Sequence, residues 1–125
     1  MNFEKYIGIP YVEKGRVDTG IDCWGLARLI YKNEYNISLP SFSAEYQTED
    51  SDRIEELFAQ YKEGWEESNS PKEGDIVVFR IFGYESHVGV AVSATHFIHS
   101  REGRDTVIES FSNPKWARRI TGFYK

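Results

Sequence analysis

The sequence predicts an α+β domain in which N-terminal helices pack on a C-terminal antiparallel sheet. In the first half of the chain, apolar residues recur with the 3.6-residue spacing of amphipathic helices. After Pro71 and Gly74 the spacing changes to the two-residue alternation of strands. Helices followed by strands are typical of the α+β class. At 125 residues, with no internal repeat or linker, the chain is predicted to form one domain over 1–125.

Three helices are predicted in the first half. A short one spans 2–8, where Gly8 ends it and Pro10 disfavours helix at the preceding residue. The second runs over 23–33, with Asp22 as its N-cap and an apolar stripe made by Cys23, Leu26, Ala27, Ile30 and Tyr31. The third repeats this spacing at Ile54, Leu57, Phe58 and Tyr61, with Asp52 and Glu55 spaced as a capping box and Gly64 at its end.

Five segments of the second half have the composition of strands, being rich in β-branched and aromatic residues. The first is almost continuously apolar, as expected of a central strand, and the second alternates strictly. The predicted strands are 75–82, 87–92, 95–99, 106–111 and 119–124.

Composition excludes several classes of function. The formal net charge of −5 and the absence of a basic stripe argue against nucleic-acid binding, and the cluster of Lys115, Arg118 and Arg119 is short enough to be a solvated edge. One cysteine allows no internal disulfide and no Cys-x-x-Cys zinc site. Chemistry at this cysteine is expected to need neither a metal nor an organic cofactor. The N-terminus has no apolar run long enough for a signal peptide or membrane span, which predicts a soluble protein, cytoplasmic at synthesis.

The single cysteine, Cys23, is a candidate nucleophile because it lies at a predicted helix start. The unpaired N–H groups and positive dipole end of the first turn favour an anion, so we expect the thiolate to form more readily there. The alternative is a small buried apolar residue, a common role for free cysteine.

Two histidines are predicted to meet on one face of the sheet. Alternation over 87–92 places His87 on one face and three valines on the other, which must be the core. If the next turn uses 92–94, residues whose numbers add to 186 lie opposite each other, which pairs His87 with His99 and points His96 away. A two-residue turn would separate the pair.

A helix-start thiol beside two imidazoles predicts a nucleophile, a base and an orienting group. His87 would take the thiol proton, and His99 would fix its tautomer through the other ring nitrogen. Each histidine taken singly could instead be a partly buried structural residue. A zinc site is less favoured, because ligands on opposite faces of a strand do not converge.

Five motifs in order resemble the NlpC-type papain-like cysteine peptidases. They are Gly8-Ile9-Pro10-Tyr11, Asp22-Cys23-Trp24-Gly25-Leu26, Gly74-Asp75-Ile76-Val77-Val78-Phe79, His87-Val88-Gly89-Val90 and Phe97-Ile98-His99. Trp24 and the C-terminal segment 114–124 look like the stand-alone members of bacteriophage and prophage tails, which are tail-assembly or tail-tip peptidases. Secreted members usually have serine where this chain has Trp24.

The resemblance implies a papain-like fold and a role for each matching residue. Cys23 matches the nucleophile, His87 the general base and His99 the residue that orients it. Tyr11 matches a tyrosine that helps to bind the oxyanion or substrate, although an aromatic residue packing on the helix is the alternative. Asp22 matches a position that binds the free amine of a cell-wall peptide.

The expected function is hydrolysis of peptidoglycan stem peptides after γ-D-glutamyl residues, at the bond to a diamino acid. Phage tail-tip proteins are the expected partners, with 116–124 as the docking segment or, alternatively, an ordinary edge strand. One alternative function is a structural tail-assembly protein with vestigial catalysis. Another is an amidase, which Glu109 or Asn113 bonded to His87 in place of His99 would favour. An acyltransferase is disfavoured, because the circularly permuted acyltransferases have histidine before cysteine and here Cys23 precedes His87.

Overall fold

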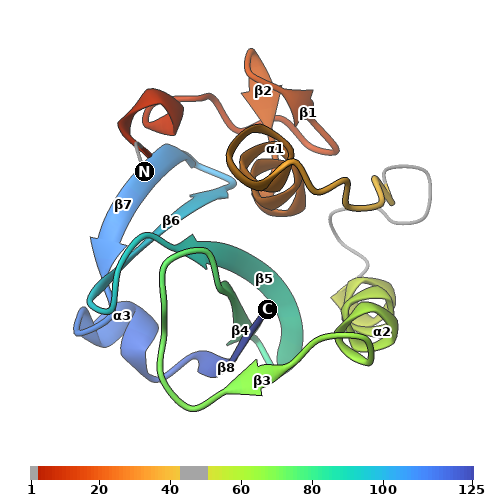
Figure 1. Cartoon of the computed structure of the whole chain (residues 1–125), viewed down its shortest axis with the longest axis vertical. Helices are drawn as coiled ribbons and strands as arrows, with labels where there is room; N and C mark the ends of the chain where they lie inside the picture. Colours follow the sequence, from red (N-terminus) through yellow and green to blue (C-terminus); the bar gives the residue numbers. More distant parts are fainter. Residues whose placement is uncertain (1–2, 43–50) are drawn as a thin grey trace.

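The computed structural model describes residues 3–42 and 51–125 (Figure 1). Within these residues, two helices and a 3₁₀ turn precede the main sheet, as predicted for an α+β fold, and a third, short helix lies between the last two strands of the chain. The elements in chain order are η1 (Glu4–Tyr6), β1 (Arg16–Val17), β2 (Gly20–Ile21), α1 (Cys23–Tyr35), α2 (Ser51–Lys62), β3 (Glu67–Ser68), β4 (Ile76–Ile81), β5 (Tyr84–Ala91), β6 (His96–Arg101), β7 (Arg104–Ser110), α3 (Pro114–Ala117) and β8 (Ile120–Tyr124).

The main sheet has six antiparallel strands in the order β3-β8-β4-β5-β6-β7. It curls strongly, so that β7 and β3 lie at the two ends of a curved wall (Figure 1). β1 and β2 form a separate two-stranded ribbon that leads directly into α1. Strands β4 and β5 form the centre of the sheet, where backbone pairing on both sides holds side chains in fixed positions.

Helix α1 packs on one face of the sheet and forms the larger core. Its N-cap is Asp22, as predicted, and Leu26 and Ile30 on its buried stripe are fully enclosed. The facing side chains of β5 include Val88 and Val90, so the prediction that the valine face is core is confirmed. Burying such an apolar stripe is what stabilises a helix of this length.

A second, smaller core fills the other face of the sheet. It consists of Val77, Phe79, Ala91, Phe97 and Trp116. His87 stands directly opposite Phe79 in the β4–β5 register and therefore on this face. Gly89 allows the next strand to approach closely, because a Cβ there would lie 3.0 Å from the carbonyl oxygen of Ile98.

Several predicted boundaries differ from the structure. The segment 2–8 contains only the 3₁₀ turn Glu4–Tyr6 among its described residues. Helix α2 begins at Ser51, so Asp52 lies inside the first turn, where its carboxylate accepts from the Arg53 N–H. The capping box was therefore a wrong prediction. The Glu55 carboxylate accepts instead from the backbone N–H of Glu85 and ties α2 to β5.

Strand β5 begins three residues earlier than predicted because β4 and β5 are joined by a tight turn. Phe82 and Gly83 have φ values of 51° and 89°, the left-handed conformation that a two-residue hairpin turn requires. This turn could not be predicted from the sequence, because Phe82 is not a residue that favours positive φ. Among the described helices, none has the length and apolar character needed to cross a membrane.

The C-terminal strand is not an edge. β8 lies between β3 and β4, and Trp116, just before it, is 1% exposed. The prediction of an edge strand was wrong, since an edge strand pairs on one side only. Trp116 contributes to the second core, while Ala117 and Arg118 are exposed. The prediction that 116–124 is a docking segment stays a prediction.

Candidate active site

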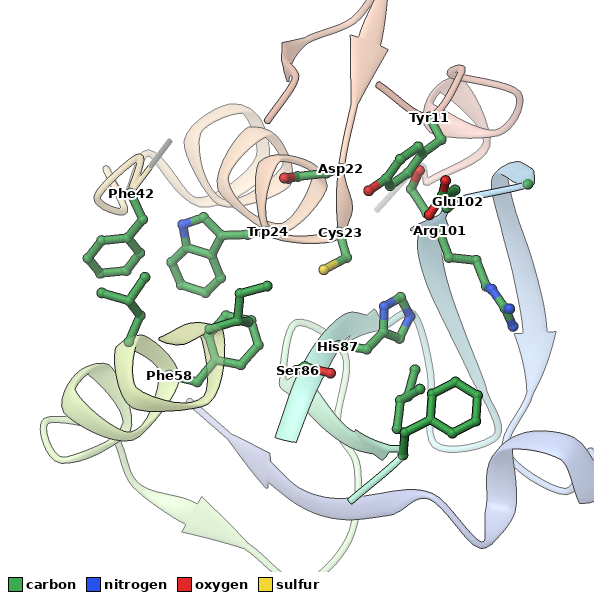
Figure 2. Close-up of a pocket in the computed structure, with 16 residues that line it drawn as sticks. Tyr11, Asp22, Cys23, Trp24, Phe42, Phe58, Ser86, His87, Arg101 and Glu102 are labelled. Atoms are coloured by element: carbon green, nitrogen blue, oxygen red, sulfur yellow. The ribbon is translucent and has the colours of Figure 1, made fainter. Parts of the chain in front are cut away.

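Cys23, the first residue of α1, opens onto a cavity of about 440 Å³. His87 of β5 projects into the same cavity, and Figure 2 shows its imidazole and the Cys23 sulfur facing each other across it. One end is polar and holds Tyr11 and Glu102, Ser86 lies beside His87, and the end around Trp24 and Phe58 is apolar. The apolar lining comprises Trp24, Phe42, Ile54, Leu57, Phe58, Ile81 and Phe82.

Burial, and not the helix dipole, dominates the acidity of the Cys23 thiol. Its surroundings raise the pKa to about 12, chiefly by burial and secondly through the negative charge of Asp22. A hydrogen bond with the Val88 backbone and the charge of Arg16 act in the opposite direction without reversing the shift. The expectation that the helix start makes the Cys23 thiol more acidic was therefore wrong, because burial and Asp22 outweigh the groups that lower its pKa.

His87 and His99 are hydrogen-bonded, with His87 Nε2 2.8 Å from His99 Nδ1. The predicted register was nevertheless wrong, because β5 and β6 pair Val90 with Ile98 and Ala91 with Phe97. Residues whose numbers add to 188 lie opposite each other, which makes the two histidines diagonal neighbours. A slip of two positions keeps every side chain on its original face, so the predicted contact survives the error in register.

The third histidine takes no part in this contact. His96 lies at the start of β6, exposed to solvent, and its Nδ1 lies 2.8 Å from the hydroxyl of Thr95. The prediction that His96 points away from the pair is confirmed. Among the described residues, no cluster of three or more His, Cys, Asp or Glu side chains has the arrangement of a metal site.

A carboxylate lies behind the histidine pair. Glu109 of β7 approaches His99, with Oε2 2.5 Å from Nε2, and its other oxygen is 3.5 Å from the amide nitrogen of Asn113. Neither Glu109 nor Asn113 bonds to His87 directly, so the arrangement expected for the amidase alternative is not present. The hydrogen-bonded order is His87, His99, Glu109 and Asn113.

Both imidazoles are held neutral by burial. His87 is 5% exposed, and burial first, then the charges of His99, Arg101 and Arg119, hold its pKa well below its ordinary value. Burial also lowers the pKa of His99, although the hydrogen bond to Glu109 opposes the shift. A neutral His87 has an unprotonated ring nitrogen, which a general base requires.

Trp116 fixes the orientation of both rings. Its indole stacks on His87 with centroids 5.6 Å apart and meets His99 edge-on at 4.7 Å. Phe79 contacts the His87 ring from the neighbouring strand at 5.4 Å. The pair is therefore enclosed by aromatic surfaces that leave few alternative rotamers.

The Asp22 carboxylate is held by hydrogen-bond donors of the protein. One carboxylate oxygen accepts from the Gly25 N–H and from the Arg16 guanidinium, each at 2.8 Å, and the other accepts from the Lys14 N–H at 3.2 Å. Asp22 is 4% exposed, and Arg16 is held by further bonds to the Ser41 carbonyl. A substrate amine would have to compete with this ion pair.

Tyr11 stands at the polar end of the cavity, beside Glu102 in Figure 2. Its backbone pairs in parallel with Ile21, two residues before the thiol. The flanking bonds from Val12 N–H to Ile21 carbonyl and from Ile21 N–H to Pro10 carbonyl fix this loop beside α1. The structure thus brings Tyr11, Cys23 and His87 to one cavity, with His99 behind.

Sequence reasoning assigned no site role to Trp116 or Arg16. Trp116 follows Asn113-Pro114, an N-cap followed by proline at the helix start, and this signal predicts the short helix α3 that carries the indole. Arg16 has no local signal, because its pairing with Asp22 depends on the β1–β2 ribbon turning back on itself.

The sequence matches the model of the NlpC/P60 family over residues 8–125. The chain is 36% identical over 121 residues to murein DD-endopeptidase MepH of Escherichia coli K12, covering 93% of this chain and 40% of that protein. It is 31% identical to the gamma-DL-glutamyl hydrolase of Bacillus subtilis 168, covering 95% of this chain and 26% of that protein.

A third relative is the murein DD-endopeptidase MepS/murein LD-carboxypeptidase of Escherichia coli K12, 26% identical over 90% of this chain. The chain spans about half the length of that protein, 53%. Solved structures agree on the fold. An NLP/P60 family protein of Staphylococcus aureus superposes with a TM-score of 0.67 at 24% identity, over 97% of this chain and 37% of that one. The NlpC/p60 domain of the peptidoglycan hydrolase SagA gives 0.61 at 21% identity, over 97% and 90%.

Proposed function

The chain belongs to the NlpC/P60 family, and from that membership and the geometry of the cavity we propose that it is a cysteine peptidase that hydrolyses peptidoglycan stem peptides. The observation that carries the proposal is the hydrogen-bonded pair His87–His99 at the wall of a cavity that also holds the single cysteine of the chain. The names of MepH and MepS describe murein endopeptidases, which supports this substrate class.

Cys23 is the proposed nucleophile and His87 the proposed base. Because His87 Nε2 is engaged by His99, Nδ1 is the nitrogen left for the thiol. As the sulfur attacks the carbonyl carbon, the thiol proton passes to Nδ1, so charge appears only with the reaction. This order suits a buried site in which the resting thiol and imidazole are both neutral.

The remaining steps use the same groups. The oxyanion of the tetrahedral intermediate would accept hydrogen bonds from the backbone N–H of Cys23, at the helix start, and from the Tyr11 hydroxyl. The imidazolium of His87 then protonates the leaving amine, and a thioester remains on Cys23. Water, deprotonated by His87, attacks the thioester and releases the acid and the free thiol.

The bond cleaved is proposed to follow a γ-D-glutamyl residue and precede a diamino acid. This assignment is supported by the resemblance of the five motifs and by the likeness to a protein named gamma-DL-glutamyl hydrolase. Asp22 is proposed to help bind a free amine of the substrate, in competition with Arg16.

Association with a phage tail is a finer proposal. Its support is the resemblance of Trp24 and of segment 114–124 to tail-associated members. Because Trp116 is buried, this side chain cannot itself contact a tail protein. A tail protein with weak catalysis is the second candidate. Affinity purification of assembling tails tests both proposals, since recovery of the chain only outside particles and assembly intermediates would contradict a tail role of either kind.

The test of the main proposal is incubation of the purified protein with defined muropeptides, followed by mass spectrometry. We expect fragments that end in a γ-D-glutamyl carboxylate, and none with Cys23→Ser. Cleavage at another stem-peptide bond would keep the enzyme class and change the specificity. Absence of any product with both cross-linked and monomeric muropeptides would favour the assembly role.

A further inference from the structure

We propose that Glu109 is a positioning residue that sets the direction of the hydrogen bonds through His99 and thereby leaves His87 Nδ1 unprotonated toward Cys23. This inference rests on the proposed function for its catalytic meaning, because it concerns the base of that reaction. Its structural content is independent of the substrate, since it concerns which ring nitrogens carry protons.

The direction follows from the chemistry of each partner. An ionised carboxylate has acceptors only, so the 2.5 Å contact requires the proton on His99 Nε2. A neutral His99 then has a lone pair on Nδ1, which must accept from His87 Nε2–H across 2.8 Å. A neutral His87 with its proton on Nε2 has its lone pair on Nδ1. Glu109 thus fixes the tautomer of His99, and His99 fixes the tautomer of His87.

The reverse direction would disable the base. If His99 carried its proton on Nδ1, it would donate to His87 Nε2, and the neutral His87 would present an N–H toward the thiol. Two neutral imidazoles alone do not decide between these directions, because either nitrogen of each ring can hold the proton. Glu109 lies at the end of this series of hydrogen bonds and can only accept, so it selects one of the two directions.

Among the described residues, three cations lie near the two histidines, and the Glu109 carboxylate opposes their effect at His99. Arg101 acts on both imidazoles, Arg119 acts on His87 and Lys115 acts on His99, and all three cations lower the histidine pKa values. Glu109 is the group that opposes them at His99, where its hydrogen bond raises the pKa.

The surroundings of Glu109 fit a positioning role. Glu109 lies on β7, paired with Phe97 of β6, and Asn113 reaches its second oxygen from the start of α3. The carboxylate side chain is 20% exposed and His99 is 1% exposed, so the contact is shielded from most solvent. Such shielding keeps a charge-assisted hydrogen bond strong.

The experiment compares Glu109→Gln with Asp105→Asn, which removes an exposed charge from the same strand. The chain has three histidines, so ¹⁵N-labelled imidazole spectra can be assigned with His96→Ala. We expect the unaltered protein and Asp105→Asn to show His87 and His99 both protonated on Nε2. Glu109→Gln should show a mixture or reversal of tautomers. Unchanged tautomers in Glu109→Gln with an intact fold would overturn the proposal.

The kinetic arm uses muropeptide hydrolysis. Glu109→Gln should lower kcat by about tenfold or more with little change in KM, as expected when an interaction acts on the base and not on substrate binding. Because loss of Glu109 removes the hydrogen bond that raises the pKa of His99, the hydrogen-bonded histidine pair should take up a proton at lower pH, and the acidic limb of the rate profile should move with it. A merely structural role would reduce activity without moving that limb, and this result would also overturn the proposal.

The tautomer spectra and the kinetics distinguish failure of the proposed function from failure of the inference about Glu109. If the unaltered protein cleaves no muropeptide, the proposed function fails, and the tautomer spectra still test Glu109. If hydrolysis proceeds and the tautomers do not respond to Glu109→Gln, only the present inference fails.

Discussion

The indole of Trp116 stacks on the imidazole of His87, with ring centroids 5.6 Å apart and an interplanar angle of 27°. The two residues come from α3 and β5 and are separated by 29 positions, so this contact forms only when the sheet curls. It places the C-terminal segment directly behind the proposed base, and the indole therefore supports both the second core and the site.

Trp116→Ala should destabilise the fold by about 3–5 kcal/mol, because it opens a large cavity in the second core. Trp116→Phe should cost less, since the indole Nε1 has no hydrogen-bond partner among the described residues and a smaller ring still covers His87. Urea unfolding measures both changes. Equal losses for the two variants would contradict the stacking argument, and a stable Ala variant would contradict the role of the indole in the second core.

Cys23 should be alkylated by iodoacetamide at a rate that keeps rising with pH up to about pH 9, because its raised pKa leaves little thiolate near neutrality. Cys23→Ser should lose hydrolysis and keep its unfolding midpoint. A plateau in the alkylation rate near neutral pH would show that a thiolate already exists in the resting site. Denatured protein provides the reference rate.

His87→Ala should reduce kcat by about 10²–10⁴, the usual contribution of a general base. His99→Ala should cost less, because His99 acts through His87, and His96→Ala should have almost no effect, since its side chain is exposed. Steady-state hydrolysis of one muropeptide measures the series. Equal losses for His96 and His99 would contradict the assignment of His99.

Stability should fall as the pH drops below the ordinary histidine value of about 6.5. His87 is neutral in the folded state because burial depresses its pKa, so the unfolded state binds the extra proton first. The contribution of neutral His87 to the free energy of unfolding is fully present above the pKa that His87 has in the unfolded state. It is lost as the pH falls toward the lower pKa that His87 has in the folded state. His87→Phe should show a smaller loss of unfolding midpoint between about pH 7 and pH 5, with His96→Phe as the control.

Arg16→Met should destabilise the fold by about 3–5 kcal/mol, because it leaves the buried Asp22 carboxylate without its cation. Arg53→Met, which removes an exposed ion pair with Glu56, should change stability by less than about 1 kcal/mol. If Asp22 also binds a substrate amine, Arg16→Met should lower KM for muropeptides with a free amine. An unchanged KM would limit Asp22 to capping α1.

Local signals predicted helix α1 accurately. Asp22 is its N-cap and the apolar stripe from Leu26 to Ile30 is buried, because capping and amphipathic spacing depend on neighbours in the chain. The strand of alternating residues that carries His87 was found for the same reason. Its true start at Tyr84 was missed, because the turn at Phe82 and Gly83 lacks the residues that usually announce it.

The sequence by itself determined the fold class, the thiol at a helix start and the shared face of His87 and His99. These depend on periodicity, which a slip of two residues in register does not disturb. Only the tertiary structure decided that burial raises the pKa of Cys23 and that Arg16 forms an ion pair with Asp22. It also decided that Glu109 and Trp116 contact His99. Burial and long-range pairing arise from segments that meet after the sheet curls, and no local pattern encodes their contacts.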